Sequence, residues 1–471
     1  MHTPPHRTET SSATPRSRLA RVLDWLTLVA VVVAVLVWLF GGFREHVWGM
    51  RISVRSWERP AMFALVLAGL RHLYVRSPTL PQVLAARWRG FWRSDARSDV
   101  GPAFVGTRLG VLMVGYLAVI TIGFVPGSER MRVSDNVLEN LPARWDAQWY
   151  LGIVTEGYRW DGNPKRQQNV VFFPAFPTAM RVAGAFLGKQ WLAAGLLLAS
   201  IAFFCALLYL HRLATELLDR DQARTAVWAL AAYPFAVFYS APYTEGFYLL
   251  GSLGTFYHLR QQQWGRAAAW GFFLGLCRPN GFLVAIPAGI LVGTEMLRQR
   301  RVIVAACAPV IAPLAGILAY SLFLYARFGD PLAWRKGQLA WGRVYAGLWG
   351  GISSLWTDRY EQISTAGFYG YTVNDPYDVM NTAAAIFVVA SLWPTARRFG
   401  LGYAAFTAVN ILPPMLIGGM MSIGRMTSVL FPAFLWLGAI LPSRHTSAWI
   451  ATSCVLQGLI AVLFFTWRPL F

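Results

Sequence analysis

The sequence has few charged residues. Only 14% of its 471 residues are Asp, Glu, Lys or Arg, whereas a soluble globular protein usually carries about a quarter. This shortage argues against an ordinary soluble fold. The alternating pattern of outer-membrane barrel strands is also missing. Hydrophobic residues make up 56% of the chain, and the runs 25–40 and 111–125 are apolar over most of a bilayer's thickness. We therefore predict an all-α, polytopic transmembrane helical bundle.

Cysteine and histidine are scarce as well. The chain has four cysteines and seven scattered histidines. Cys205, Cys277, Cys307 and Cys454 all fall in apolar segments, and their spacing fits neither a disulfide framework nor a zinc site. We predict that they are small buried side chains. No metal ligands are predicted and no cofactor is obligatory, although the acidic residues between the spans leave a divalent ion possible.

Basic residues outnumber acidic ones, 42 to 22, which gives a formal net charge of +20. The arginines do not gather into one patch, so we predict no nucleic-acid partner. Many lie in short loops, as the positive-inside rule expects, and Arg16, Arg18 and Arg21 before the first apolar run place the N-terminus in the cytoplasm. The basic 42–58 loop lies on the outer side in this topology and is the one counter-signal.

Thirteen membrane spans are expected. They lie near 24–41, 59–75, 104–125, 190–210, 223–239, 244–259, 266–279, 281–297, 302–325, 379–394, 401–417, 425–441 and 447–466. The regions are a disordered cytoplasmic N-terminus (1–22), an N-terminal transmembrane region (23–125), a first, catalytic extracytoplasmic loop (126–170), a central transmembrane region (171–325), a second extracytoplasmic loop (326–378) and a C-terminal transmembrane region (379–471). The protein is therefore expected to be a multi-pass protein of the plasma membrane.

The two long loops, 126–170 and 326–378, share the outer face in this topology. Both are rich in acidic and aromatic residues, and loops of this length are usually functional. A transporter instead concentrates its polar groups at the bilayer midplane. Acidic groups at one surface favour chemistry on a lipid-borne substrate at the interface.

The segment RWDAQWYLGIVTEGY (144–158) predicts a short amphipathic helix that begins near Ala143. Trp145 and Trp149 fall on one side of it, and Asp146 and Tyr150 share the adjacent strip. Indole rings at this spacing anchor a helix in the headgroup layer. The segment is therefore either an interfacial anchor, with Asp146 in water, or part of an active site.

The segment NVVFFPAFPTAM (169–180) is an apolar run interrupted by prolines, and we expect a helix to begin near Pro177. Irregular backbone at membrane depth must be covered by protein or line a cavity. Phe172 and Phe173 could line the path of an isoprenoid chain. Core packing explains them equally well.

The segment YPFAVFYSAPYTEGFYLL (233–250) predicts a tight outer turn that brings Tyr243 and Glu245 to the point where a helix re-enters the membrane. Glu245 in the first turn of that helix favours the helix dipole. This structural explanation and a substrate-binding role are both open.

Arginine appears in two further apolar segments. Arg278 lies in LCRPNGF (276–282), followed by Asn280, and an arginine at membrane depth is costly unless it is paired or faces a wet cavity. Its planar fork suits a phosphate, although snorkelling to the interface would also explain it. Arg425 in IGRMTSVLFPAF is a second phosphate candidate or a headgroup anchor.

Six segments in this order resemble the PIG-V family, the GPI mannosyltransferase II group with its bacterial homologues. They are RWDAQWYLGIVTEGY, VVFFPAFP, PFAVFYSAPYTEGFYLL, CRPNGF, FGDPLAW and GRMTSVLFPAF, and they extend over roughly 144–434. The resemblance implies a C-type glycosyltransferase fold. It also implies inverting transfer of mannose from a polyprenyl-phosphate carrier on the extracytoplasmic face, with Asp146 in the place of the catalytic acidic residue. The family has one span before this loop, where three are expected here.

The resulting hypothesis makes Asp146 the general base, and Arg278 and Arg425 the donor-phosphate ligands. The side chains expected to contact substrate or lipid are Trp145, Trp149, Tyr150, Phe172, Phe173, Tyr243, Glu245 and Asn280. The partners are a polyprenyl-phosphate-linked sugar donor, a glycan, glycolipid or protein acceptor, and the bilayer. The alternatives are a lipid or glycolipid flippase and a non-catalytic membrane scaffold. A flippase would need polar residues at mid-depth, and apart from Arg278 the predicted spans are nearly free of charge there.

Overall fold

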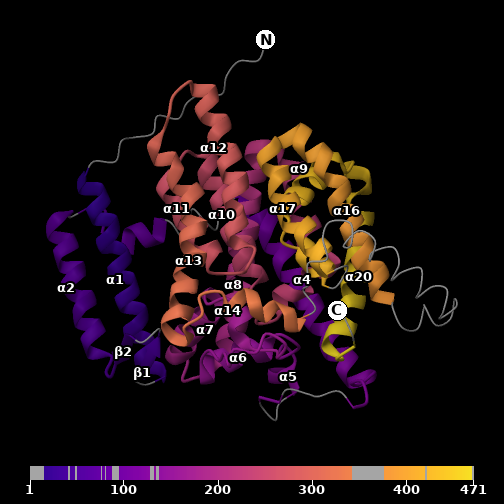
Figure 1. Cartoon of the computed structure of the whole chain (residues 1–471). Helices are drawn as coiled ribbons and strands as arrows, with labels where there is room; N and C mark the ends of the chain where they lie inside the picture. Colours follow the sequence, from indigo (N-terminus) through magenta and orange to yellow (C-terminus); the bar gives the residue numbers. More distant parts are fainter. Residues whose placement is uncertain are drawn as a thin grey trace. The chain divides into compact units, whose positions relative to one another are not determined.

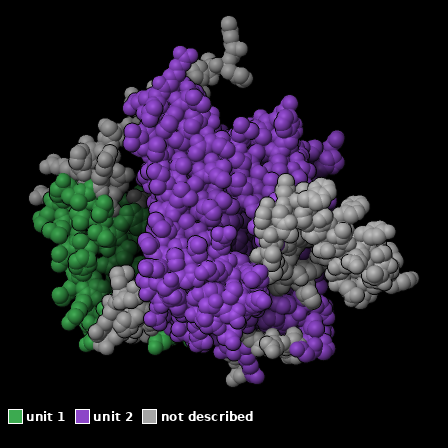
Figure 2. All heavy atoms as spheres, in the orientation of Figure 1, with its two compact units in different colours: residues 1–94, 182–190 green, residues 95–181, 191–471 purple. Residues whose placement is uncertain are grey.

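The computed structural model describes residues 15–40, 43–47, 50–75, 77–79, 81–86, 95–127, 132–133, 137–341, 376–418 and 422–468. The chain forms two compact units (Figure 2). Unit 1 contains Met1–Ser94 and Val182–Gln190, and unit 2 contains Asp95–Arg181 and Trp191–Phe471. Most of the predicted second loop (342–375) and most of the predicted disordered N-terminus (1–14) lie outside the described residues.

Unit 1 is built on two helices, α1 (Pro15–Phe40) and α2 (Glu58–Tyr74). Between them β1 (Phe43–Val47) and β2 (Met50–Val54) pair antiparallel. The sequence predicted both helices but described 42–58 only as a basic loop. Its hairpin was missed because two five-residue strands carry too little alternation to stand out from their arginines.

A buried ion pair joins the two helices of unit 1. Arg71 Nε lies 2.7 Å from Asp24 Oδ1, and the two side chains are 4% and 9% exposed. Removing either partner would leave an uncompensated charge in an apolar setting, which is strongly destabilising. The pair therefore fixes how α1 and α2 align.

The described residues of unit 2 are mostly helical (Figure 1). Its elements are α4 (Asp95–Thr121), α5 (Val137–Asn140), α6 (Ala147–Glu156), η1 (Asn169–Val171), α7 (Ala175–Phe186, whose last residues belong to unit 1), α8 (Trp191–Leu217), α9 (Arg220–Ala231), η2 (Pro234–Ser240), α10 (Glu245–Arg260), α11 (Trp264–Gly275), η3 (Gly281–Val284), α12 (Ala285–Gln299), η4 (Val304–Cys307), α13 (Ala308–Phe328), α14 (Ala333–Lys336), η5 (Gly337–Trp341), α16 (Pro376–Phe399), α17 (Leu401–Gly418), α18 (Ile423–Thr427), α19 (Phe431–Ile440) and α20 (Ser443–Phe465).

Six helices among the described residues are long and apolar enough to cross a membrane. They are Asp95–Thr121, Trp191–Leu217, Gly281–Gln299, Val304–Phe328, Val379–Phe399 and Ser443–Phe465. Three shorter apolar helices are Val22–Trp38, Leu401–Ile417 and Phe431–Ile440. The prediction of a mostly helical chain with several membrane-spanning helices is confirmed to the extent of these six candidate spans. The count of thirteen spans stays a prediction.

Proline breaks two of the predicted spans. The span expected at 223–239 ends as an α-helix at Ala231, and Pro234 opens the 3-10 turn η2. The span expected at 425–441 divides into α18 and α19, with Pro432 in the first turn of α19. Proline lacks an N–H and fixes φ, so it suits a helix start better than a helix interior. The broken ends leave backbone groups and polar side chains inside an apolar unit.

The prediction that the spans are nearly free of charge at mid-depth, apart from Arg278, needs a correction. The span expected at 104–125 begins at Asp95, so Arg108 lies near the middle of α4, and it is 6% exposed. Its guanidinium donates to the carbonyl oxygens of Ala231 (3.1 Å) and Ala236 (2.5 Å) and to Ser240 Oγ (3.0 Å). Arg108 was not among the predicted residues, because it lies close to one end of the span expected at 104–125. Arg108 fastens the end of α9 and the turn η2.

Close helix packing in unit 2 depends on small residues, as is common in membranes. A Cβ at Gly275 of α11 would lie 2.2 Å from the carbonyl oxygen of Pro313 in α13 and 2.9 Å from Gly316 Cα. We expect Gly275→Ala to reduce the free energy of unfolding by about 1–3 kcal/mol, the usual effect of overpacking. Thermal unfolding of the purified protein in detergent measures this change. Gly293→Ala is the matched control, because nothing lies within 4 Å of a Cβ there, and equal melting temperatures for both variants would contradict the prediction.

Candidate active site

The segment before α6 turns sharply. The predicted helix start near Ala143 is too early: α6 begins at Ala147, Asp146 is its N-cap residue, and Trp145 has φ +50°. Asp146 makes no side-chain capping hydrogen bond. An N-cap aspartate commonly binds the backbone N–H groups of its own helix. Here the carboxylate is directed to another part of the unit.

Tyr243 fixes the backbone on both sides of Trp145. The Asp146 N–H donates to Tyr243 Oη (3.0 Å), and the Tyr243 hydroxyl donates to the Arg144 carbonyl oxygen (2.9 Å). Burial raises the pKa of the Tyr243 phenol well above its usual value, so the hydroxyl keeps the proton that it donates. The residue holds the turn in place as both donor and acceptor.

Arg144 ties the same turn to the end of α20. Its Nε donates to the carbonyl oxygen of Phe465 (2.9 Å), and its guanidinium carbon lies 5.3 Å from the ring centroid of Trp467. A cation beside the last carbonyl groups of a helix favours the helix dipole. The position of Asp146 therefore depends on a helix that lies far along the chain.

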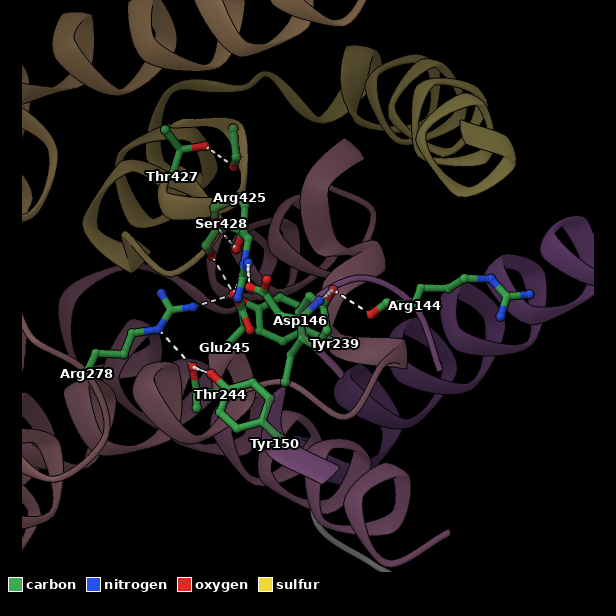
Figure 3. Close-up of polar contacts among 12 residues, drawn as sticks. Arg144, Asp146, Tyr150, Tyr239, Thr244, Glu245, Arg278, Arg425, Thr427 and Ser428 are labelled. Carbon is green, nitrogen blue, oxygen red and sulfur yellow. Dashed lines mark hydrogen bonds and ion pairs between the residues drawn. The ribbon is translucent and has the colours of Figure 1, made fainter. Parts of the chain in front are cut away.

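Four charged side chains meet at the ends of different elements, as Figure 3 shows. Glu245, the first residue of α10, accepts hydrogen bonds at Oε1 from Arg278 Nη2 and Arg425 Nε. Arg425 Nη1 donates to Asp146 Oδ2. These contacts form a chain in the order Arg278, Glu245, Arg425 and Asp146, which we call the charge chain.

Burial differs along the charge chain. The Glu245 side chain is 0% exposed, Arg425 12%, Arg278 13% and Asp146 20%. No described residue donates a hydrogen bond to Glu245 Oε2. A buried charge without a partner is strongly destabilising, so Glu245 and the arginines need one another. Asp146 is the member most open to its surroundings.

Aromatic and hydroxyl groups complete the arginine sites. The Arg425 guanidinium carbon lies 4.5 Å from the ring centroid of Tyr243, and the Arg278 guanidinium carbon lies 5.6 Å from that of Tyr248. Arg278 Nε also donates to Thr244 Oγ1 (2.9 Å). Cation–π contacts orient a guanidinium without neutralising its charge. The ring contacts therefore help to orient both guanidinium groups.

Tyr150 joins the site from α6. Its hydroxyl donates to Thr244 Oγ1 (3.3 Å), and burial raises the pKa of this phenol. The sequence placed Tyr150 on the strip next to the tryptophans, and the structure brings it to the hydroxyl group that also binds Arg278.

The other predicted residues lie around this centre. Trp149 stacks on Phe172, with ring centroids 5.7 Å apart at 15°, and meets Trp341 edge-on at 5.3 Å. Because Trp341 ends η5, the described parts of both predicted loops meet here. Trp145 packs on Trp467, with ring centroids 5.1 Å apart.

Two predicted residues have different surroundings. Asn280 Nδ2 donates to Asn410 Oδ1 (2.7 Å), which also accepts from the Tyr248 hydroxyl (2.7 Å). Asn280 is therefore linked to Arg278 through Asn410 and the Tyr248 ring. Phe173 belongs to a separate core cluster and packs on Tyr320, with ring centroids 4.7 Å apart. The structure does not bring Phe173 to the charge chain.

Sequence reasoning missed Arg144, Asn410 and Arg108 and did not single out Thr244. Arg108 carried a usable signal, since an arginine within an apolar run is a functional or structural candidate by default. Arg144 lies in the same segment as Asp146. Asn410 gave only a lone polar residue in an apolar helix, and nothing in the sequence pairs it with Asn280.

Known proteins resemble this chain in its central part. Residues 125–297 match the family model of the mannosyltransferases (PIG-V). The match confirms the family resemblance on these residues and includes Asp146, Glu245 and Arg278, whereas Arg425 lies beyond it. No curated protein matches the chain. Among the described residues, no group of three or more His, Cys, Asp or Glu could hold a metal ion.

Solved structures show a distant similarity. The oligosaccharyltransferase of Archaeoglobus fulgidus in complex with zinc and sulfate is 13% identical, with a TM-score of 0.42, over 77% of this chain and 53% of that one. The archaeal oligosaccharyltransferase from the same organism in complex with an inhibitory peptide and a dolichol-phosphate is 12% identical, with a TM-score of 0.39, over 76% of this chain and 56% of that one. The chain thus spans about half the length of these proteins.

The bonds of Tyr243 can be tested directly. We expect Tyr243→Phe to reduce the free energy of unfolding by about 1–3 kcal/mol, because the Asp146 N–H and the Arg144 carbonyl each lose a hydrogen-bond partner. Thermal unfolding and limited proteolysis near residue 145 measure the effect. In the control Tyr257→Phe, a half-buried phenol is changed away from the site, and both readouts should stay as in the unmodified protein. A Tyr243→Phe protein as stable and as protease-resistant as the control would contradict this role.

Proposed function

We propose that this protein is an integral-membrane inverting glycosyltransferase. It transfers mannose from polyprenyl-phosphate-mannose to an acceptor hydroxyl on the extracytoplasmic face. The observation that carries the proposal is the charge chain, in which a partly exposed carboxylate, Asp146, contacts Arg425, and Arg425 shares one buried glutamate with Arg278. The family match over residues 125–297 supports the reaction type.

Asp146 is the general base in this mechanism. The acceptor oxygen attacks the anomeric carbon of the mannose and forms the new glycosidic bond. The bond from that carbon to the phosphate oxygen breaks, and its electron pair stays on the phosphate. The proton of the acceptor hydroxyl moves to Asp146 and is later lost to water. A single displacement of this kind inverts the anomeric configuration.

Arg278 and Arg425 bind the phosphate of the donor. Each guanidinium has five N–H donors, and the bonds of the charge chain leave some of them for phosphate oxygens. Charge-assisted bonds from two arginines strengthen as charge grows on the leaving phosphate. Because that phosphate is already charged in the donor, the arginines contribute to donor binding as well as to rate.

The topology that suits this reaction has thirteen spans and a cytoplasmic N-terminus. The site then lies at the outer surface of the plasma membrane, where a lipid-linked sugar can reach it. The aromatic group of Trp149, Phe172 and Trp341 offers a wall for the donor lipid or the sugar ring. The acceptor is a glycan, a glycolipid or a protein.

The base assignment predicts the behaviour of Asp146→Asn. We expect this variant to bind the lipid donor and to lose transfer by about 10²–10⁴-fold, the usual contribution of a positioned base. The measurement follows radiolabelled polyprenyl-phosphate-mannose incubated with the purified protein and membrane extract, with and without EDTA. Near-normal transfer by the variant would remove the base role. Label that crosses a vesicle membrane unchanged would instead support a flippase.

The phosphate assignment predicts that Arg278→Ala weakens donor binding. Loss of one charge-assisted contact to a phosphate should raise the KM for the donor by at least about tenfold, because hydrogen bonds to charged groups contribute about 1.5–3 kcal/mol. Arg266→Ala is the matched control, since Arg266 lies in α11 and bonds Gln263 away from the site. Equal donor KM values for the two variants would move the phosphate contact away from Arg278.

A further inference from the structure

We infer that Glu245 is a positioning residue that holds Arg278 and Arg425 as a pair, and that Arg425 exchanges Asp146 for the phosphate of the arriving donor. In this view the carboxylate of Asp146, the base, stays paired with Arg425 until the donor binds. The inference deepens the proposed function and rests on it. It assigns Glu245 a role other than contact with substrate or lipid.

The shared oxygen of Glu245 is the first ground. Arg278 lies in the turn after α11 and Arg425 in α18, and both guanidinium groups donate to Glu245 Oε1. Two guanidinium groups that share one carboxylate oxygen are close enough to repel each other unless that anion lies between them. The carboxylate brings two cations from separate elements close enough to bind the oxygens of one phosphate.

The unequal burial of the two carboxylates is the second ground. Glu245 is 0% exposed, and its backbone is fixed at the start of α10, so it cannot turn away from the arginines. Asp146 is 20% exposed and makes no bond to its own helix end. When a phosphate competes for Arg425, Asp146 is the carboxylate that can separate from the guanidinium group.

The position of Arg425 on Asp146 is the third ground. A general base needs a carboxylate oxygen within hydrogen-bond reach of the acceptor hydroxyl. Arg425 Nη1 donates to Asp146 Oδ2 and so engages one of the two carboxylate oxygens. Donor binding that draws Arg425 toward the phosphate frees this oxygen, so the base becomes available once the sugar is in place.

Charge balance agrees with the exchange. The charge chain holds two guanidinium groups and two carboxylates, so its formal charges cancel. An arriving phosphodiester adds one negative charge and must share the arginines. Coupling between two sites is reciprocal: if the phosphate weakens the contact between Arg425 and Asp146, removal of the Asp146 charge strengthens phosphate binding.

The decisive experiment measures binding of a polyprenyl phosphate, without sugar, to the full-length protein in detergent by titration calorimetry. We expect Asp146→Asn to bind it about tenfold more tightly than the unmodified protein, within the usual range of coupling between sites. Asp161→Asn is the matched control, since Asp161 is in the same loop and pairs with Arg166, and its affinity should not change. Equal or weaker binding by Asp146→Asn would overturn the exchange.

Two substitutions of Glu245 test the positioning role. Glu245→Gln keeps an acceptor oxygen and loses the charge, and Glu245→Asp keeps the charge and withdraws the oxygen by one methylene. We expect both to bind polyprenyl phosphate about tenfold more weakly. In the double variant with Asp146→Asn, affinity should return while transfer stays lost. A general structural defect would not be reversed by a change at Asp146.

Each outcome has a separate meaning. Tighter binding by Glu245→Gln would show that Glu245 only repels the phosphate, and unchanged binding by Glu245→Asp would show that its position is unimportant; either result overturns the positioning role. Should Glu245→Gln not fold, as judged by elution in size-exclusion chromatography, Glu245→Asp decides alone. The base assignment is tested by transfer and the exchange by affinity, so the two can fail independently.

Discussion

The arrangement of the site depends on one buried carboxylate oxygen shared by two arginines. Glu245 is fully buried at the start of α10, and Arg278 and Arg425 reach it from two separate segments of the chain. Removal of that anion would leave the charge of Arg278 without its carboxylate partner and Arg425 with Asp146 alone, which is strongly destabilising. The polar bonds around it, from Thr244 and Tyr150 to Tyr243 and Arg144, fix the segments that carry the four charges. The bonds of Glu245 to the two arginines therefore both stabilise the fold and define the site.

The charge chain also suits the proposed reaction electrostatically. As the leaving phosphate gains one negative charge, Asp146 takes up a proton and its own negative charge is neutralised. The total formal charge of the buried group is therefore the same before and after transfer. In surroundings of low dielectric constant, a step that creates no net charge avoids most of the desolvation free energy that would otherwise oppose it.

The sequence predicted local features better than long-range ones. Apolar runs predicted most helices, and Arg278 and Arg425 were recognised because a charge in an apolar segment must have a partner. The partner itself could not be predicted: Glu245 had a sufficient explanation as a residue of the first helical turn, and nothing local joins it to either arginine. The bonds of Arg144 to Phe465 and of Asn280 to Asn410 depend on the same long-range packing. The breaks at Pro234 and Pro432 lie inside runs whose overall apolar character predicted a single span each.

The wide separation of the site residues along the chain has a consequence for biosynthesis. Asp146 and Arg425 are 279 positions apart, and Arg144 and Phe465 are 321 positions apart. Chains are made from the N-terminus, and early segments fold before late ones exist. A nascent protein that has inserted its first helices already carries the carboxylate but neither the second cation nor the final helix that steadies its turn. The contacts that define the site can therefore be complete only after Arg425 and the end of α20 at Phe465 have been synthesised.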